Sequence, residues 1–91
     1  MPTINEIERK ARIFALFGDP TRLRILNLLS RKKTANVSEI AKEVEMSVAC
    51  VSHHLQLLKD NAVVDSKRKG NNIYYQLIYD PLVKNLQSLV K

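Results

Sequence analysis

The stretch VSEIAKEVEMSVACVSHHLQLLKDNAVV, residues 37–64, decides how this chain folds. Just before it, Asn36 and Glu39 have the spacing of a helix-capping box, with Asn in place of Ser or Thr. Apolar residues then recur at helical spacing up to EMS, which predicts a turn without glycine. Ser47 is placed to cap a second helix that runs to about Asp60. Two short helices joined by a tight turn are typical of a helix-turn-helix.

Upstream of this pair, the sequence predicts two more helices. Apolar residues fall at helical spacing over residues 3–17, and the segment TRLRILNLLSRKK, residues 21–33, repeats the pattern. Gly18 suits the position after a helix, Asp19 suits a cap, and Pro20 suits the first helical position. These three residues therefore predict a sharp corner between the two helices.

Downstream of the pair, the apolar period changes to that of strands. The segment AVVDSKRKGNNIYYQLIY holds two β-type runs, residues 63–64 and 73–77, around a polar tip. Gly70 and Asn71 at this tip can take positive φ, as a tight hairpin requires. A leucine stripe in the last segment predicts a final helix over residues 81–90.

The composition supports one small helical domain. The chain has 91 residues, of which 45% are hydrophobic, and it contains two glycines. The expected fold class is mainly α with a β-hairpin wing, a winged helix-turn-helix in the order ααααββα, forming a single domain over residues 1–91. No secretory leader is expected, there is no run of about 18 apolar residues, and a single cysteine excludes an internal disulfide. A cytoplasmic protein without a membrane span is expected.

Positive charge is concentrated in two short runs. The chain carries 15 Lys and Arg against 9 Asp and Glu, a net charge of +6, which suits nucleic acid, an anionic membrane or an acidic protein. Either run alone is typical of a solvated surface, but two runs beside a helix-turn-helix favour double-stranded DNA. The residues expected to hold the DNA backbone are Lys67, Arg68, Lys69 and Asn71 in the wing, and Lys32 and Lys33 at the end of the second helix.

The second helix of the pair has a small, polar outer face. On a helical wheel, its core stripe consists of Val48, Val51, Leu55 and Leu58. The residues expected to face the major groove are Ser47, Ala49, Ser52, His53 and Gln56. Small side chains allow a close approach to DNA, and Ser, His and Gln can hydrogen-bond to base edges or phosphates.

Three segments resemble the ArsR/SmtB family of small winged-helix repressors: ALFGDPTRLRILNLL, VSEIAKEVEMSVACVSHHLQLLKDNAVV and KGNNIYYQL. The resemblance covers residues 14–77. It implies a homodimer, joined mainly through the helices at residues 3–17 and 81–90, that binds an inverted-repeat operator. Where the family usually has glycine after the second helix of the pair, this chain has Ala62, and Asn61 beside it is expected to make the turn.

The metal-binding positions known in this family lack ligands here. One family site uses a Cys-x-Cys pair in the third helix, at positions that this chain fills with Asn36 and Ser38. Another uses Asp and His on the last helix, where this chain has Asp80 and neither His nor Glu. The sequence therefore predicts no metal and no other cofactor, and it leaves the effector open.

Cys50, His53 and His54, the chain's only cysteine and histidines, lie within five residues of one another. Cys50 and His54 could give two ligands to one metal, but zinc takes three or four from protein. His54 is therefore expected to be packed or to face a phosphate. Cys50 is either a small half-buried residue or a redox handle whose oxidation weakens DNA binding. The redox hypothesis fails if Cys50→Ser responds to peroxide as wild type does.

No arrangement of catalytic residues is visible, so an enzyme is not predicted. The expected function is sequence-specific transcriptional regulation by a homodimeric repressor, although activation is not excluded. Two alternatives remain: a constitutive architectural DNA-binding protein and a winged-helix protein-interaction module. The small, polar and basic surface disfavours the second alternative.

Overall fold

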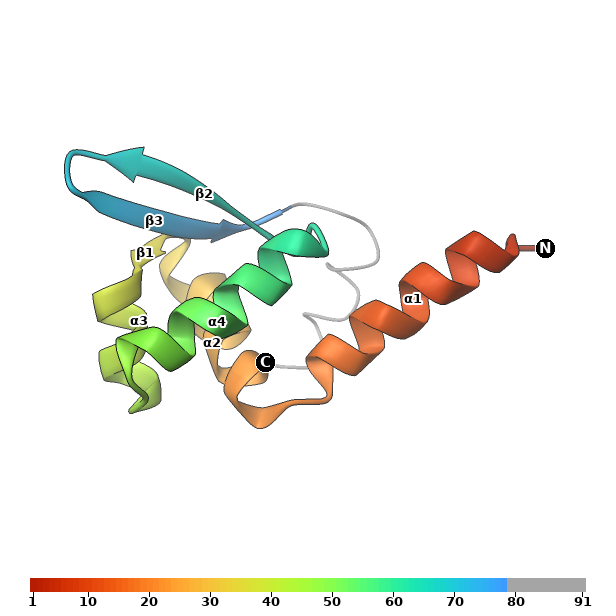
Figure 1. The fold of residues 1–91 in the computed structure, drawn as a ribbon, viewed down its shortest axis with the longest axis horizontal. Helices are drawn as coiled ribbons and strands as arrows, with labels where there is room; N and C mark the ends of the chain where they lie inside the picture. The colour runs from red at the N-terminus through yellow and green to blue at the C-terminus, as the bar shows by residue number, and fades with distance from the viewer. Residues whose placement is uncertain (79–91) are drawn as a thin grey trace.

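Residues 1–78 are described by a computed structural model. They form, in order, α1 (Ile4–Phe17), α2 (Pro20–Lys32), β1 (Ala35–Asn36), α3 (Val37–Val44), α4 (Val48–Asp60), β2 (Val64–Lys69) and β3 (Asn72–Leu77). The helix expected over residues 81–90 lies outside the described residues. Helices α2, α3 and α4 gather on one side of the small sheet, and α1 projects away from them (Figure 1).

Each described helix begins at a side-chain cap. The carboxylate of Asp19 accepts a hydrogen bond from the backbone amide three residues on at 2.9 Å, and Pro20 follows at the first turn of α2. Ser47 caps α4 in the same way at 3.1 Å. Asn36 and Glu39 make both hydrogen bonds of the capping box that begins α3. These local predictions are confirmed.

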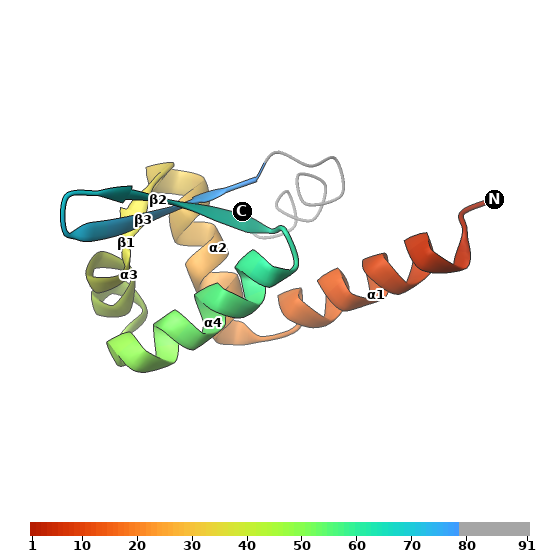
Figure 2. The ribbon, with the colours of Figure 1, turned by 45° about the horizontal axis from the view of Figure 1, so that its top comes forward.

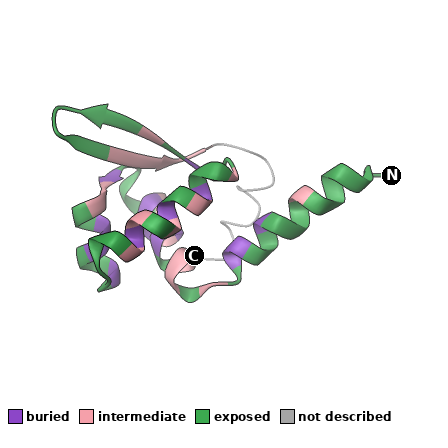
Figure 3. Ribbon diagram, viewed as in Figure 1, coloured by how far each residue is buried: buried purple, intermediate pink, exposed green. Residues whose placement is uncertain are grey.

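The core is an apolar cluster to which every described helix contributes. It consists of Ile13, Leu16, Phe17, Ile25, Leu26, Leu28, Leu29, Ala35, Ile40, Ala41, Val44, Val51, Leu55, Leu58, Val63 and Val64. In Figure 3 the buried positions follow the inward faces of α2, α3 and α4 and the C-terminal end of α1. Val48 departs from the predicted core stripe, because it lies in the first turn of α4 and is 52% exposed.

The sheet contains a strand that the sequence did not predict. The two residues of β1 pair antiparallel with β3, with Ala35 opposite Tyr75, and the strand order is β1-β3-β2. A two-residue strand is too short to show an alternating pattern. The β2–β3 hairpin extends as a ribbon beyond the helices (Figure 2), and Gly70 lies in its turn with a φ of +61°.

Three turn residues differ from the sequence expectation. The left-handed residue after α4 is Ala62, with a φ of +58°, and Asn61 has a φ of −101°. In the hairpin, Asn71 does not share the positive φ of its neighbour. Gly18 closes α1 with a φ of −76°, so its backbone amide caps the helix without a left-handed turn. The left-handed conformation at Ala62 costs about 1 kcal/mol because of its Cβ atom.

Candidate nucleic-acid interface

The outer face of α4 carries the residues that the sequence assigned to the major groove. Ser47, Ala49, His53 and Gln56 are exposed, and Ser52 is half-buried. All are small or polar, so they can approach base edges closely, and Ser, His and Gln can hydrogen-bond to them.

The side chain of Gln56 is held along α4 by a second residue. Its Nε2 donates a hydrogen bond of 2.8 Å to the carboxylate of Asp60, one turn further on. This contact leaves the amide oxygen of Gln56 as an acceptor at the exposed surface.

Two exposed apolar residues lie at the start of α4. Met46 in the turn is 38% exposed and Val48 is 52% exposed. The helical period predicted that Val48 belongs to the core stripe. Val48 is the first residue of α4, and this position at the end of the helix could have indicated its exposure.

Exposed cations line the wing. Lys67, Arg68, Lys69 and Asn71 are all exposed, and the three cations belong to β2 rather than to the loop at its tip. Because side chains alternate along a strand, Arg68 lies on the opposite face from Lys67 and Lys69. The wing therefore presents positive charge on both of its faces.

A hydrogen bond ties the wing to α4. Nζ of Lys59, in the last turn of α4, donates to Oγ of Ser66 in β2 at 2.8 Å. At the other end of the hairpin, Nζ of Lys69 lies 5.8 Å from the ring centroid of Tyr74, a cation–π distance. The first contact holds the base of the wing beside α4, and the second lies within the hairpin near its turn.

The second pair of expected backbone contacts lies at the end of α2. Lys32 and Lys33 are both exposed, and Lys33 ends the helix with a φ of +71°. Positive charge there also stabilises the C-terminal end of the helix dipole. Their neighbour Arg31 makes an ion pair of 2.6 Å with Glu43 of α3. Exposure is consistent with a phosphate-binding role for the two lysines but is not specific to it.

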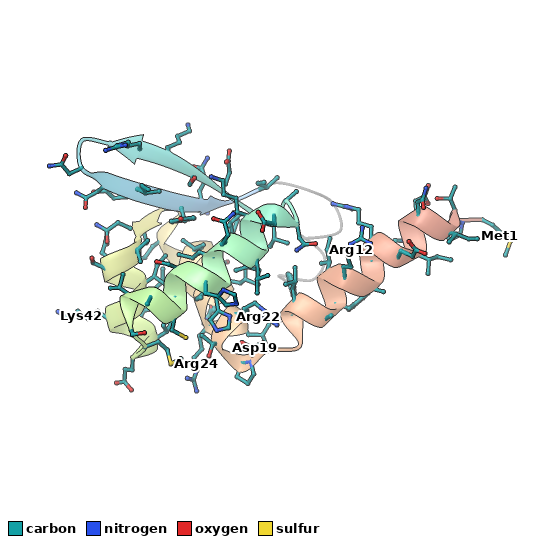
Figure 4. The ribbon with its side chains drawn as sticks, in the orientation of Figure 1. Met1, Arg12, Asp19, Arg22, Arg24 and Lys42 are labelled. Atoms are coloured by element: carbon teal, nitrogen blue, oxygen red, sulfur yellow. The ribbon has the colours of Figure 1, made fainter. Side chains whose placement is uncertain are left out.

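His53 and His54 lie in different surroundings. His53 is exposed, whereas His54 is half-buried and its Nδ1 lies 3.2 Å from Nη1 of Arg22 in α2. Arg22 also donates through Nε to the backbone oxygen of Leu16 at 2.8 Å. Figure 4 shows Arg22 and Asp19 in the corner between α1, α2 and α4.

Asp19 reinforces this corner electrostatically. The hydrogen bond from the backbone amide of Arg22 lowers the pKa of Asp19 below its ordinary value, outweighing the opposing effect of burial. The positive guanidinium of the same arginine acts in the same direction. The ionised carboxylate therefore stabilises the start of α2.

No metal site is formed within residues 1–78. No three His, Cys, Asp or Glu side chains in this range lie close enough together to hold an ion. The rings of His53 and His54 are arranged edge to face, with 6.2 Å between their centroids. Cys50 is a half-buried free thiol. Asn36, at one of the family's ligand positions, is engaged in capping α3. The proposed redox role of Cys50 stays a prediction.

The N-terminal helix exposes an apolar face. Ile4, Ile7 and Phe14 are 74%, 53% and 55% exposed, whereas the buried residues of α1 all belong to its C-terminal half. The N-terminal half extends away from the other helices in both views (Figures 1 and 2). Large apolar side chains gathered on an exposed helix face mark an interaction surface.

No helix in the described range is both long enough and apolar enough to cross a membrane. The sequence and the fold are similar to those of known proteins. Residues 19–66 match a family model, which is described as "Bacterial regulatory protein, arsR family".

One relative and two solved structures illustrate the similarity. The HTH-type transcriptional regulator MJ1325 of Methanocaldococcus jannaschii is 40% identical over 88 residues, which are 96% of this chain and 97% of that protein. The structure of AntR, an antimony-specific transcriptional repressor, aligns with a TM-score of 0.84 at 34% identity over 96% of this chain and 78% of that chain. The homodimeric winged helix-turn-helix domain Mb0332 of Mycobacterium bovis aligns with a TM-score of 0.82 at 30% identity, covering 92% of this chain and 76% of that chain.

Proposed function

Because the chain belongs to the arsR family of bacterial regulatory proteins, we propose that it is a homodimeric repressor that binds an inverted-repeat operator in double-stranded DNA. The observation that carries the proposal is the exposed polar face of α4 beside a basic wing. A helix of this kind fits the major groove, and a basic ribbon next to it reaches the sugar-phosphate backbone. In this proposal the protein acts in the cytoplasm, on the DNA that it regulates.

The two surfaces have separate roles in this proposal. The groove-facing residues are Ser47, Ala49, Ser52, His53 and Gln56. The backbone-binding residues are Lys67, Arg68, Lys69, Asn71, Lys32 and Lys33. The first group supplies sequence preference, because only base edges differ between sequences. The second group supplies most of the affinity and its dependence on salt, because phosphates are common to all DNA.

The dimer interface in this proposal includes the apolar face of α1, with residues 81–90 of both protomers. Ile4, Ile7 and Phe14 are exposed in the single chain and would be covered by a second copy. The homodimeric description of Mb0332, which has the same fold, supports this assignment. In a two-fold dimer, the two α4 helices should lie roughly 34 Å apart to enter successive major grooves.

The proposal does not include a metal effector at the family's third-helix position. AntR is described as antimony-specific, but a thiophilic ion requires thiolates, and this chain has Asn36 and Ser38 at that position. Asn36 is also engaged as the cap of α3. The effector, if the protein has one, is therefore expected to act elsewhere.

The experiment that tests the proposal is selection of bound duplexes from a random DNA pool, followed by sequencing. We expect an inverted repeat whose half-sites are about one helical turn apart. Binding without sequence preference would favour the architectural alternative. No binding to any duplex at low salt would reject the proposal and favour the protein-interaction module. Repeating the selection with added metal ions and with peroxide would reveal an effector.

A further inference from the structure

A single residue, Arg22, joins the three helices that meet behind the surface proposed to face DNA. Its backbone amide donates to Asp19, its Nε donates to the carbonyl of Leu16 at 2.8 Å, and its Nη1 lies 3.2 Å from Nδ1 of His54. These contacts link the C-terminal turn of α1, the first turn of α2 and the middle of α4.

The contact between Arg22 and His54 determines which nitrogen of the imidazole carries the proton. A guanidinium has only donors, so Nδ1 of His54 must accept the hydrogen bond. An imidazole whose Nδ1 accepts carries its proton on Nε2 when it is neutral. Arg22 therefore selects the Nε2–H tautomer of His54.

The other nitrogen of His54 is available to a ligand. Nε2 makes no hydrogen bond within residues 1–78, and no buried side-chain nitrogen in this range lacks a partner, so Nε2 is accessible to solvent. His54 lies on the shoulder of α4, between the buried stripe and exposed His53, whose ring it meets at 6.2 Å. When a helix enters the major groove, residues on its shoulders face the phosphates that border the groove.

We propose that Arg22 is a positioning residue for DNA binding, which holds His54 in the tautomer whose Nε2–H binds a DNA phosphate. The inference rests on the proposed function, because it requires α4 to enter a groove. It adds a contact from the inner shoulder of α4 to those of the outer face and the wing.

The rival explanation for any effect of Arg22 on DNA binding is a direct contact between its own charge and a phosphate. The two explanations differ in their salt dependence. A charged contact releases counterions and contributes about 0.9 to the slope of log K against log salt, whereas a neutral imidazole donor releases almost none. Arg22→Met should therefore weaken binding without changing the slope if it acts through His54.

The first experiment measures the tautomer of His54 in the free protein by long-range ¹H–¹⁵N NMR correlation with labelled histidine. Wild type is expected to show the Nε2–H form, and Arg22→Met is expected to show a mixture of both tautomers. Arg24→Met removes the same charge from an exposed position on the same helix, so it should leave the tautomer unchanged. If Arg22→Met does not fold, Arg22→Leu replaces it, because leucine also removes both guanidinium contacts.

The second experiment titrates a mixed-sequence duplex at several salt concentrations, because a phosphate contact does not depend on sequence. Arg22→Met and His54→Ala are each expected to bind about fivefold more weakly per half-site, the effect of one neutral hydrogen bond, with an unchanged slope. The double variant should bind no more weakly than His54→Ala. His54→Gln should recover part of the loss, since its amide can donate from a similar position.

The outcomes separate this inference from the proposed function. If wild type binds no duplex at low salt, both are rejected. If wild type binds and His54→Ala binds equally well, only the inference is rejected. A flatter salt slope for Arg22→Met, or additive losses in the double variant, would assign the effect to Arg22 itself. A tautomer that stays unchanged when Arg22 is substituted would also overturn the inference.

Discussion

Replacing Lys67, Arg68 and Lys69 with glutamine removes three exposed positive charges from β2. None of the three belongs to the core, and the β2–β3 pairing uses backbone groups, so the variant should keep the fold. We expect weaker binding to every DNA sequence and a flatter dependence of affinity on salt. The physical reason is that each cation on a phosphate releases counterions when the complex forms.

The size of the change follows from where the cations lie. If all three contact phosphates, the slope of log K against log salt falls in magnitude by about 2.7 per protomer and about 5.4 per dimer. Between 50 and 200 mM salt, wild type would then lose about three orders of magnitude more affinity than the variant. If only the strand face with Lys67 and Lys69 meets the backbone, the change is about 1.8 per protomer.

Fluorescence anisotropy titrations of a labelled duplex over a salt series measure these slopes. The single variants at the three positions assign the contribution of each face of the wing. Arg12→Gln on α1, which extends away from the wing (Figure 4), removes one exposed charge and should leave the slope unchanged. A triple variant with the wild-type slope would refute the assignment of the wing to the DNA backbone.

Four further predictions test other parts of the molecule. His53→Ala should weaken binding to the selected operator more than to random DNA; equal losses would remove His53 from base recognition. Phe14→Glu should convert the dimer to a folded monomer in sedimentation experiments, because its side chain is 55% exposed in the single chain. Asp19→Ala should lower the free energy of unfolding by about 1 kcal/mol at neutral pH. Because hydrogen bonding lowers the pKa of Asp19 in the folded state, this difference should shrink in urea titrations as pH falls through that lowered pKa. Leu28→Ala, at a position with 0% exposure, should cost about 2–5 kcal/mol in the same assay.

Features with local causes could be predicted from the sequence. Asp19, Asn36 and Ser47 each begin a helix, since a cap depends on residues only three positions away. The apolar periods of α2, α3 and α4 also identified most of the core, because each helix has one buried face. Residues 73–77 were predicted to form a strand because β-branched and aromatic residues favour strands.

Features that depend on the ends of elements or on distant partners could not be predicted. Val48 has the period of a core residue, but it is the first residue of α4 and is exposed, whereas Val51, three residues later, is buried. The pairing of β1 requires β3, which lies about 40 residues further along the chain. Ala62 occupies a left-handed position because the chain must turn there to bring Val63 into the core, and its side chain gives no sign of this.

The surroundings of Cys50, His53 and His54 also depend on residues that are distant in the sequence. Their proximity in the sequence resembles a metal site, yet the helix gives His53 and His54 different surroundings. The partner of His54 is Arg22, 32 residues earlier, and no local pattern indicates this contact. Since Arg22 also binds the carbonyl end of α1, the helix proposed to join two protomers and the helix proposed to enter DNA share one guanidinium. The spacing of two α4 helices in a dimer would therefore depend on this corner, without any metal at the family's usual positions.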